Sequence, residues 1–296
     1  MAIRTLVTSL ALSAGAALAG PGGLFRSPDV SATQVVFVYG DDLWLAPREG
    51  GTAQRLTSPV GAESFPRFSP DGNSVAFVGH YEGANDLYVL PTAGGTPVRV
   101  THHPSRERLC GWTPKGELVF ASDALSPSGR VQRLFRVSAS GGLPEVYPMP
   151  YAASGALSAD GRYLAYTPHS LDFASWKRYQ GGMATDVWLF DLQENRARQV
   201  TTWEGNDTAP MWHGGVLYYL SDAGPVPRLN LWAYDPAKDA HTQLTTFSDY
   251  DVRSPSMGPG PEGQGEIVYQ RGGRIELLDL ATLKTRALEL TIPGDR

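Results

Sequence analysis

An internal repeat of about 44 residues constrains the fold of this 296-residue chain more than any other feature. A short apolar pair, usually ending in an aromatic residue, occurs six times, at successive spacings of 44, 47, 53, 44 and 44 residues: Leu43-Trp44, Leu87-Tyr88, Leu134-Phe135, Val187-Trp188, Leu231-Trp232 and Ile275-Glu276. A second marker, exemplified by Leu56-Thr57 and Val100-Thr101, recurs at nearly the same spacing. The spacing of both markers becomes longer at the same unit. The chain therefore consists of six related units.

Turn signals divide each unit into four short segments with the periodicity of strands. The clearest signal is Ser69-Pro70-Asp71-Gly72, where the proline fixes its own φ and the glycine supplies a residue with positive φ. Related sequences follow at 113–116 and 158–161. In the first unit we assign Pro28-Asp29 to the same turn, after a short strand over 24–26. Each unit is thus expected to form a four-stranded antiparallel sheet.

Four strands in 44 residues cannot bury both faces of their sheet, whereas radial stacking of six such sheets can. We therefore predict an all-β, six-bladed β-propeller with blades at about 22–58, 59–104, 105–150, 151–204, 205–248 and 249–292. The marker aromatics are expected to pack between neighbouring blades. Because the sixth unit ends with its own strand over 286–292, we expect no exchanged strand at the closure of the ring, and side-chain packing between the first and last blades instead.

The first 19 residues resemble a secretory signal peptide. Arg4 precedes an apolar stretch over 5–18, and Ala17-Leu18-Ala19 forms a small-x-small cleavage site before Gly20. The stretch is short and rich in Ser and Gly for a membrane anchor. We therefore expect residues 20–296 to be exported, to the periplasm or beyond, with no membrane attachment after cleavage.

Charge and cysteine content exclude two classes of protein. A net charge of −5 and a pI near 5.7 argue against a nucleic-acid partner, which would require a basic face. The single cysteine, Cys110, excludes an intrachain disulfide, and its position in an apolar run predicts a buried thiol.

Several runs of sequence resemble a known family. FVYGDDLW (37–44), ESFPRFSPDG (63–72), SWKRYQGG (175–182) and TTFSDYDVR (245–253) are similar to the amino-terminal six-bladed propeller of tricorn protease. The resemblance extends over roughly residues 22–292. The repeat by itself is shared with TolB and with the propellers of prolyl oligopeptidase-type enzymes, whereas the run over 175–182 is more specific.

This resemblance implies a large serine protease in which two propellers precede a PDZ-like domain and a catalytic domain. It implies that the six-bladed ring is a channel for peptides, that peptides or a peptidase domain or subunit are its partners, and that the assembly is a large ring-shaped oligomer. None of the family's catalytic positions has a counterpart in this chain. We therefore expect no catalytic residue here, and proteolysis by this polypeptide alone is in doubt.

Candidate binding residues lie at the start of the innermost strands, which face the axis of a propeller. Alignment of the units on their turns places nine of them near one mouth of the channel: Glu63, Ser64, Arg67, Glu107, Arg108, Asp207, Thr208, Asp251 and Arg253. Such a mixed set could bind the backbone or the termini of an extended peptide. The alternatives are a calcium site, for which neutral amide ligands are missing, and plain solvated loop ends.

The insertion in the fourth unit is the second candidate. Trp176 and Tyr179 flank Lys177-Arg178, a combination that suits a docking surface for an adjoining domain or subunit. The alternative is a long loop that folds over its own blade.

Reactive groups and metal ligands are not predicted. The chain lacks a Gly-x-Ser-x-Gly motif, and His102-His103 has no further ligand at suitable spacing. Asp41-Asp42 resembles half of a calcium loop but is better explained by a hairpin turn. We expect no catalytic residue, no metal and no cofactor.

Two functional hypotheses follow. The first is a non-catalytic propeller of a tricorn-like serine peptidase, truncated or separately encoded, which gates peptides or docks to the peptidase. The second is an exported TolB-like scaffold for protein partners. TolB-like chains usually carry an α/β domain ahead of the propeller, for which residues 20–24 leave no room, and this favours the first hypothesis. A metal-dependent hydrolase is disfavoured by the lack of ligands.

Overall fold

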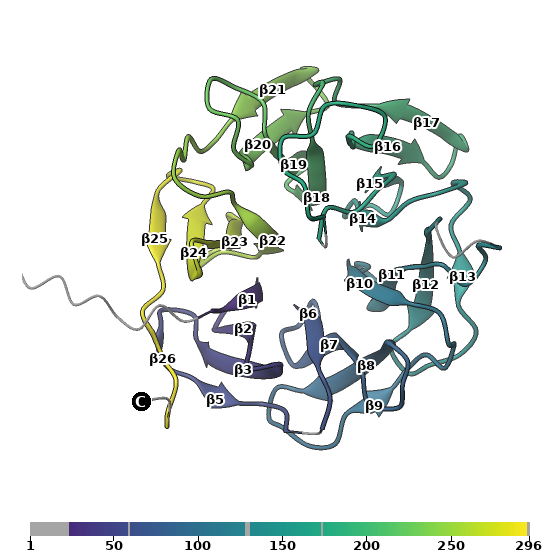
Figure 1. Cartoon of the computed structure of the whole chain (residues 1–296). Helices are drawn as coiled ribbons and strands as arrows, with labels where there is room; N and C mark the ends of the chain where they lie inside the picture. The colour runs from purple at the N-terminus through teal and green to yellow at the C-terminus, as the bar shows by residue number, and fades with distance from the viewer. Residues whose placement is uncertain (1–23, 59, 128–130, 173, 295–296) are drawn as a thin grey trace, which may run out of the picture.

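The computed structural model describes residues 24–58, 60–127, 131–172 and 174–294. Within these ranges the chain forms six four-stranded antiparallel sheets around a central axis and no helix, as predicted (Figure 1). The predicted signal peptide lies outside the described residues. No described segment is a helix long and apolar enough to span a membrane.

Each blade uses four strands in chain order, with the first strand innermost (Figure 1). Blades 1 to 3 are formed by β1 (Arg26–Val30), β2 (Gln34–Tyr39), β3 (Asp42–Pro47) and β5 (Gln54–Arg55); β6 (Glu63–Phe68), β7 (Ser74–Gly79), β8 (Asp86–Pro91) and β9 (Val98–Arg99); β10 (Glu107–Trp112), β11 (Glu117–Ser122), β12 (Arg133–Ser138) and β13 (Glu145–Val146). Blades 4 to 6 are formed by β14 (Ser154–Leu157), β15 (Tyr163–Thr167), β16 (Trp188–Asp191) and β17 (Arg196–Gln199); β18 (Asp207–His213), β19 (Val216–Ser221), β20 (Asn230–Asp235) and β21 (Ala240–Gln243); β22 (Arg253–Gly258), β23 (Glu266–Arg271), β24 (Arg274–Asp279) and β25 (Thr285–Ala287).

The turn that joins β6 to β7 has the chemistry that its sequence predicts. The Gly72 amide donates to the Ser69 carbonyl at 2.8 Å, and Gly72 has a φ of +73°. The Asp71 carboxylate accepts from the Ser69 hydroxyl and from the Asn73 amide. The same carbonyl-to-amide bond closes the turns at 113–116 and 158–161. Local side-chain bonds and one glycine therefore set the register of these hairpins.

The assignment of Pro28-Asp29 to a turn is wrong. Both residues lie inside β1, and the chain reverses after Val30. They belong to a different repeated feature, a β-bulge in the innermost strand in which a residue of positive φ precedes a proline. It occurs in blades 1, 2, 5 and 6, at Ser27, Phe65, Ala209 and Ser254. Proline is tolerated there because the first strand is a sheet edge and needs no amide donor at a bulge.

The hydrophobic core lies between the blades rather than within one of them. Leu43 of blade 1 packs in one cluster with Phe77 and Tyr88 of blade 2, and Leu87 of blade 2 packs with Phe135 of blade 3. The Phe77 and Tyr88 rings stack at 5.7 Å between centroids. The marker pairs therefore join neighbouring blades, as predicted, and each buried ring contributes about 2–3 kcal/mol.

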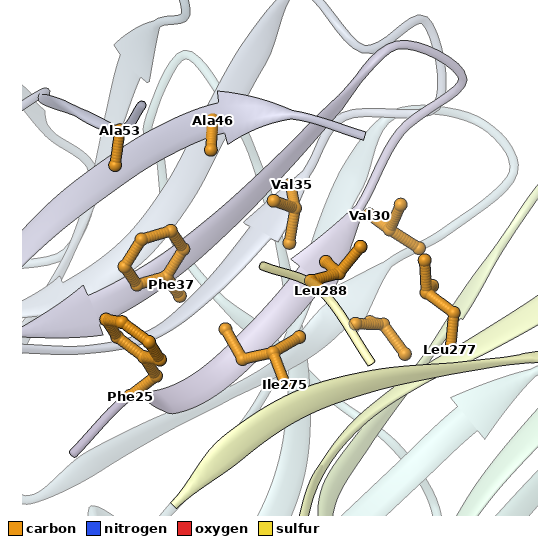
Figure 2. Packing of buried hydrophobic residues seen from close by; sticks show 10 residues of the cluster. Phe25, Val30, Val35, Phe37, Ala46, Ala53, Ile275, Leu277 and Leu288 are labelled. Carbon is orange, nitrogen blue, oxygen red and sulfur yellow. The ribbon is translucent and has the colours of Figure 1, made fainter. Parts of the chain in front are cut away.

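Blades 1 and 6 meet through a shared core of side chains, and neither takes a strand from the other, as predicted. Figure 2 shows Phe25 and Phe37 of the first blade facing Ile275 and Leu288 of the last. The guanidinium of Arg48 also binds the Glu266 carboxylate through two hydrogen bonds, at 2.7 and 2.6 Å. We call this contact between the two ends of the ring the seam.

The predicted strand over 286–292 is divided between the two sides of the seam. Its first part belongs to β25 of blade 6, whereas β26 (Leu290–Thr291) pairs in parallel with β4 (Gly51–Thr52), next to blade 1. Backbone bonds of 2.8 and 2.9 Å run from Gly51 and Ala53 to this terminal segment. This short ladder supplements the side-chain packing of the seam at the outer rim (Figure 1).

Candidate functional site: the axial channel

An axial cavity of about 770 Å³ runs between the innermost strands of all six blades. Its wall is formed by β1, β6, β10, β14, β18 and β22, together with Ser170, Leu171 and Asp172 of the insertion. Phe65, Trp112 and Trp212 give parts of the wall an aromatic character. A volume of this size accommodates a ligand of the size of a short peptide.

Two of the predicted acidic residues are hydrogen-bonded between blades, and a third, Asp207, is buried without a hydrogen bond from another described residue to its carboxylate. The Thr57 hydroxyl donates to Glu63 at 2.5 Å, and the Thr101 hydroxyl donates to Glu107 at the same distance. Burial raises the pKa of Glu63 and raises that of Glu107 to about 8, although these hydroxyl bonds oppose the shift. Burial likewise raises the pKa of Asp207 to about 7. The carboxyl groups of Glu63 and Glu107 thus connect consecutive blades, and we call these two contacts the joints.

A sequence signal for these joints exists and was missed. Each acid follows the threonine of the second marker by six residues: Thr57 and Glu63, Thr101 and Glu107, Thr201 and Asp207. The same threonine hydroxyls also accept from backbone amides of the third strand, for example from Leu43 and Leu87 at 2.8 Å. The fixed spacing therefore marks a structural connection between consecutive blades.

The predicted arginines lie in the wall of the cavity, as do the smaller Ser64 and Thr208. Arg67 donates to the Pro66 carbonyl at 2.8 Å, and burial lowers its pKa, although the nearby Asp29 carboxylate opposes this. The Arg253 side chain, in contrast to its backbone in the β22–β23 ladder, forms no hydrogen bond or ion pair with another described residue. The wall thus carries guanidinium groups that are only partly neutralised.

Arg108 differs because a carboxylate from the insertion neutralises it. Its guanidinium binds Asp172, which also accepts from the Ser170 hydroxyl at 2.8 Å. Burial opposes the charge on both groups, but their mutual attraction prevails, so the pKa of Arg108 is raised and that of Asp172 is lowered. The guanidinium also lies 4.9 Å from the centre of the Phe65 ring. This ion pair fixes the insertion to the third blade.

Two residues of the wall were not predicted to be there. Asp29 is buried and links three blades, since it accepts from the Phe68 amide of blade 2 at 2.6 Å and from the Ser256 hydroxyl of blade 6. Cys110 is half-buried and lines the cavity beside Arg108, so the prediction of a buried thiol is wrong. An apolar sequence context did not reveal that an inner strand has one face on a hollow axis.

The insertion between β15 and β16 contacts blades other than its own. Lys177 forms an ion pair with Asp251 at 2.8 Å, and Arg178 donates to the Pro227 carbonyl at 3.1 Å. The Trp176 and Tyr179 rings lie 6.2 Å apart and remain 45% and 37% exposed. The cations therefore contact other blades, and the two aromatic rings are partly exposed to solvent. Asp251 is occupied by this contact and is not a free group of the channel.

Two kinds of reactive arrangement, a serine nucleophile and a metal centre, can be compared with the side chains of the described residues. No histidine among them is hydrogen-bonded to a serine hydroxyl, as a serine nucleophile requires. In the described ranges, no three His, Cys, Asp or Glu side chains converge in a way that could hold a metal ion. Guanidinium groups beside aromatic walls suit the non-covalent binding of carboxylates and peptide backbone.

Comparison with known proteins shows which family and which relatives the chain resembles. The family described as the tricorn protease N-terminal beta propeller domain matches residues 22–284. A tricorn protease homolog from Saccharolobus solfataricus is 27% identical over 92% of this chain and 25% of its own length. A putative tricorn protease homolog 2 from Streptomyces coelicolor is 32% identical over 92% of this chain and 23% of its own. The chain thus spans about a quarter of the length of these relatives.

A shorter relative and two solved structures complete the comparison. A putative tricorn-like protease N-terminal subunit from Sulfurisphaera tokodaii is 28% identical over 54% of this chain and 83% of its own length. The crystal structure of the tricorn protease matches 90% of this chain and 26% of its own with a TM-score of 0.79 at 23% identity. A putative TolB from Agrobacterium tumefaciens matches 84% of this chain and 90% of its own with a TM-score of 0.66 at 17% identity, which shows the fold alone. The match over residues 22–284 places this chain in the family of the tricorn protease N-terminal β-propeller domain.

Proposed function

We propose that this chain is the peptide-conducting propeller of a tricorn-like serine peptidase, with the catalytic residues on another part of the enzyme or on a separate chain. Membership of the family supports this, and so does the existence of a relative named as an N-terminal subunit. We further propose that the chain is exported, on the basis of its first 19 residues. Its partners are then peptides and the peptidase.

The observation that carries this proposal is the axial cavity with the insertion in its wall. We propose that the insertion gates the passage of peptides. Two of its ties are weak, since Lys177 is 60% exposed in its ion pair with Asp251 and Arg178 holds a single carbonyl. Although Asp251 itself is only 10% exposed, both cations of the insertion are solvent-exposed side chains, and water screens their contacts, so we propose that this part of the insertion can be displaced. The outward-facing Trp176 and Tyr179 would contact the peptidase.

Cys110 offers a direct test of the gate because it is the only thiol of the chain and lies in the wall of the cavity. We expect the Lys177→Gln variant to react faster than wild type with a bulky maleimide, and at the same rate with a small one. The matched control is Lys238→Gln, which removes a more exposed lysine, also ion-paired with an aspartate, from a turn of blade 5. Equal rates for all three proteins with the bulky reagent would refute gating by the insertion.

Association with the peptidase needs its own experiment. Tagged chain should co-purify with the PDZ-like and peptidase part of a tricorn-like enzyme from the same cell, and Trp176→Ala with Tyr179→Ala should weaken this capture. Capture of unrelated envelope proteins in its place would favour the TolB-like alternative.

A further inference from the structure

The carboxylates in the wall of the axial cavity are all engaged in internal bonds, whereas two of its guanidinium groups are not hydrogen-bonded to a carboxylate. Sequence alignment places acidic and basic residues together at the channel mouth, but the carboxylates that line the cavity already have donors. Arg26 binds Asp41 at 2.7 Å, and Arg108 binds Asp172. Glu63 accepts from Thr57 and Tyr81, and Asp29 accepts from Phe68 and Ser256. These groups have little capacity left for a ligand.

Two guanidinium groups of the same wall have no carboxylate hydrogen-bonded to them. Arg253, at the start of β22, lines the main cavity and a small adjoining one of about 40 Å³ beneath the insertion. Among the described residues no side chain pairs with it, because Lys177 takes the neighbouring Asp251. Arg67, in β6, bonds only to a backbone carbonyl. Both are half-buried, so each has lost part of its hydration. The Asp29 carboxylate lies near Arg67 without a hydrogen bond to it, and Arg253 is paired with no carboxylate among the described residues.

A half-buried guanidinium of this kind favours a ligand that brings its own negative charge. Attraction between unit charges 4 Å apart is about 4 kcal/mol at the effective dielectric constant of a protein surface, compared with about 1 kcal/mol in water. The planar guanidinium also presents paired donors that match the two oxygens of a carboxylate. A cationic ligand would meet the opposite effect at both positions.

We propose that the channel selects carboxylate-bearing peptides, which Arg253 and Arg67 bind through their guanidinium groups. The inference rests on the proposed function, since it names the class of peptide that the channel takes. The carboxylate can come from an aspartate or glutamate side chain or from the carboxyl terminus of the peptide. Nothing in this selection requires a reaction within the propeller.

The test uses the full chain and four fluorescent hexapeptides of otherwise identical sequence, measured by anisotropy. One carries two glutamates and an amidated end, one carries two lysines and an amidated end, one is neutral and amidated, and one is neutral with a free carboxyl terminus. We expect the glutamate peptide to bind at least 10-fold more tightly than the lysine peptide. The two neutral peptides differ only in the terminal carboxylate. Tighter binding of the neutral peptide with a free carboxyl terminus would therefore show that the terminus, and not only an acidic side chain, is recognised.

Arg253→Gln should weaken the binding of the carboxylate peptides by about 10-fold and leave the neutral amidated peptide unchanged, since a charge-assisted hydrogen bond contributes about 1.5–3 kcal/mol. No hydrogen bond or ion pair joins the Arg253 side chain to another described side chain, so this variant is expected to fold. The control is Arg196→Gln, which removes the same charge from the exposed outer strand β17. Arg67→Gln is a second variant, checked for folding because Arg67 lies near Asp29.

The outcomes separate this inference from the function on which it rests. If all four peptides bind equally, or if Arg253→Gln and Arg196→Gln behave alike, the channel takes peptides but does not select carboxylates, and the inference is wrong. If none of the four binds to the wild-type chain, the proposed function fails and the inference fails with it.

Discussion

The buried ion pair at the seam provides the sharpest test of how the ring is closed. Arg48 and Glu266 are only 11% and 2% exposed, and they come from opposite ends of the chain. Arg48→Met should leave the Glu266 carboxylate buried with no other hydrogen-bonded cation among the described residues. Loss of one partner of such a pair costs about 3–5 kcal/mol, so we expect a decrease of about 3 kcal/mol in the free energy of unfolding.

Removal of the Glu266 charge should lower the free energy of unfolding by less than removal of the Arg48 charge, because a third residue remains paired with Arg48. In Glu266→Gln the Arg48 guanidinium keeps its ion pair with Glu49, at 2.5 Å on the surface. We therefore expect a loss of about 1–2 kcal/mol. The double variant Arg48→Met with Glu266→Leu should recover much of the loss, because an apolar pair leaves no buried charge.

Urea denaturation followed by the fluorescence of the seven tryptophans measures these differences. The matched control is Lys238→Met, which breaks an exposed pair with Asp235 in a turn of blade 5 and should cost less than 1 kcal/mol. If Arg48→Met costs no more than Lys238→Met, or if the double variant is no more stable than Arg48→Met alone, then the seam does not depend on this pair.

Three further predictions follow from the joints, the turns and the absence of a nucleophile. Because burial raises the pKa of Glu107 to about 8, from an ordinary value of 4.5, the folded state holds this proton more tightly than the unfolded chain. Its stabilising effect is complete below about pH 4.5 and is lost as the pH rises to 8, so denaturation midpoints should fall over this range, and less steeply in Glu107→Gln. Gly72→Ala should lower the free energy of unfolding by about 1 kcal/mol in urea melts, because φ is +73° there, whereas Gly182→Ala, with a negative φ and open space around it, should change it little. The purified chain should not hydrolyse fluorogenic peptides, and turnover that a serine-directed reagent abolishes would contradict this.

The architecture could be predicted from the sequence because its determinants are local and are repeated. Gly72, Gly116 and Gly161 close equivalent turns, and the marker pairs carry the contacts between blades. The error at Pro28-Asp29 has a local cause as well. Those two residues resemble the Pro-Asp-Gly turn, but Val30 stands where the turn needs a glycine, so the chain continues as a strand.

The candidate site was less predictable because it depends on where a side chain points and on contacts between distant segments. Glu63 and Arg67 lie four positions apart on one strand, yet the bulge at Phe65 interrupts the alternation of faces. One side chain therefore enters a joint and the other faces the cavity. Alignment of the repeat units on their turns located the innermost strand correctly. It could not show which side chains of that strand face the cavity and which enter the contact between blades. The ties of the insertion to Asp251 and Pro227 lie too far along the chain for any pattern to indicate.

The joints and the channel wall place different demands on the same strands. A joint needs one acid six residues after its threonine in the sequence, as at Thr101 and Glu107, because the hydrogen bond between these two side chains connects two blades. Two positions past a bulge, the innermost strands carry Asp29, Arg67, Met211 and Ser256, so the fold accepts an acid, a base, an apolar or a neutral polar side chain at equivalent places facing the axis. The charge of the channel can thus change without loss of the ring. The acids of the joints therefore serve the contact between blades, whereas the residues that face the axis, such as Arg67 and Arg253, are the ones to which we assign the proposed selection of peptides.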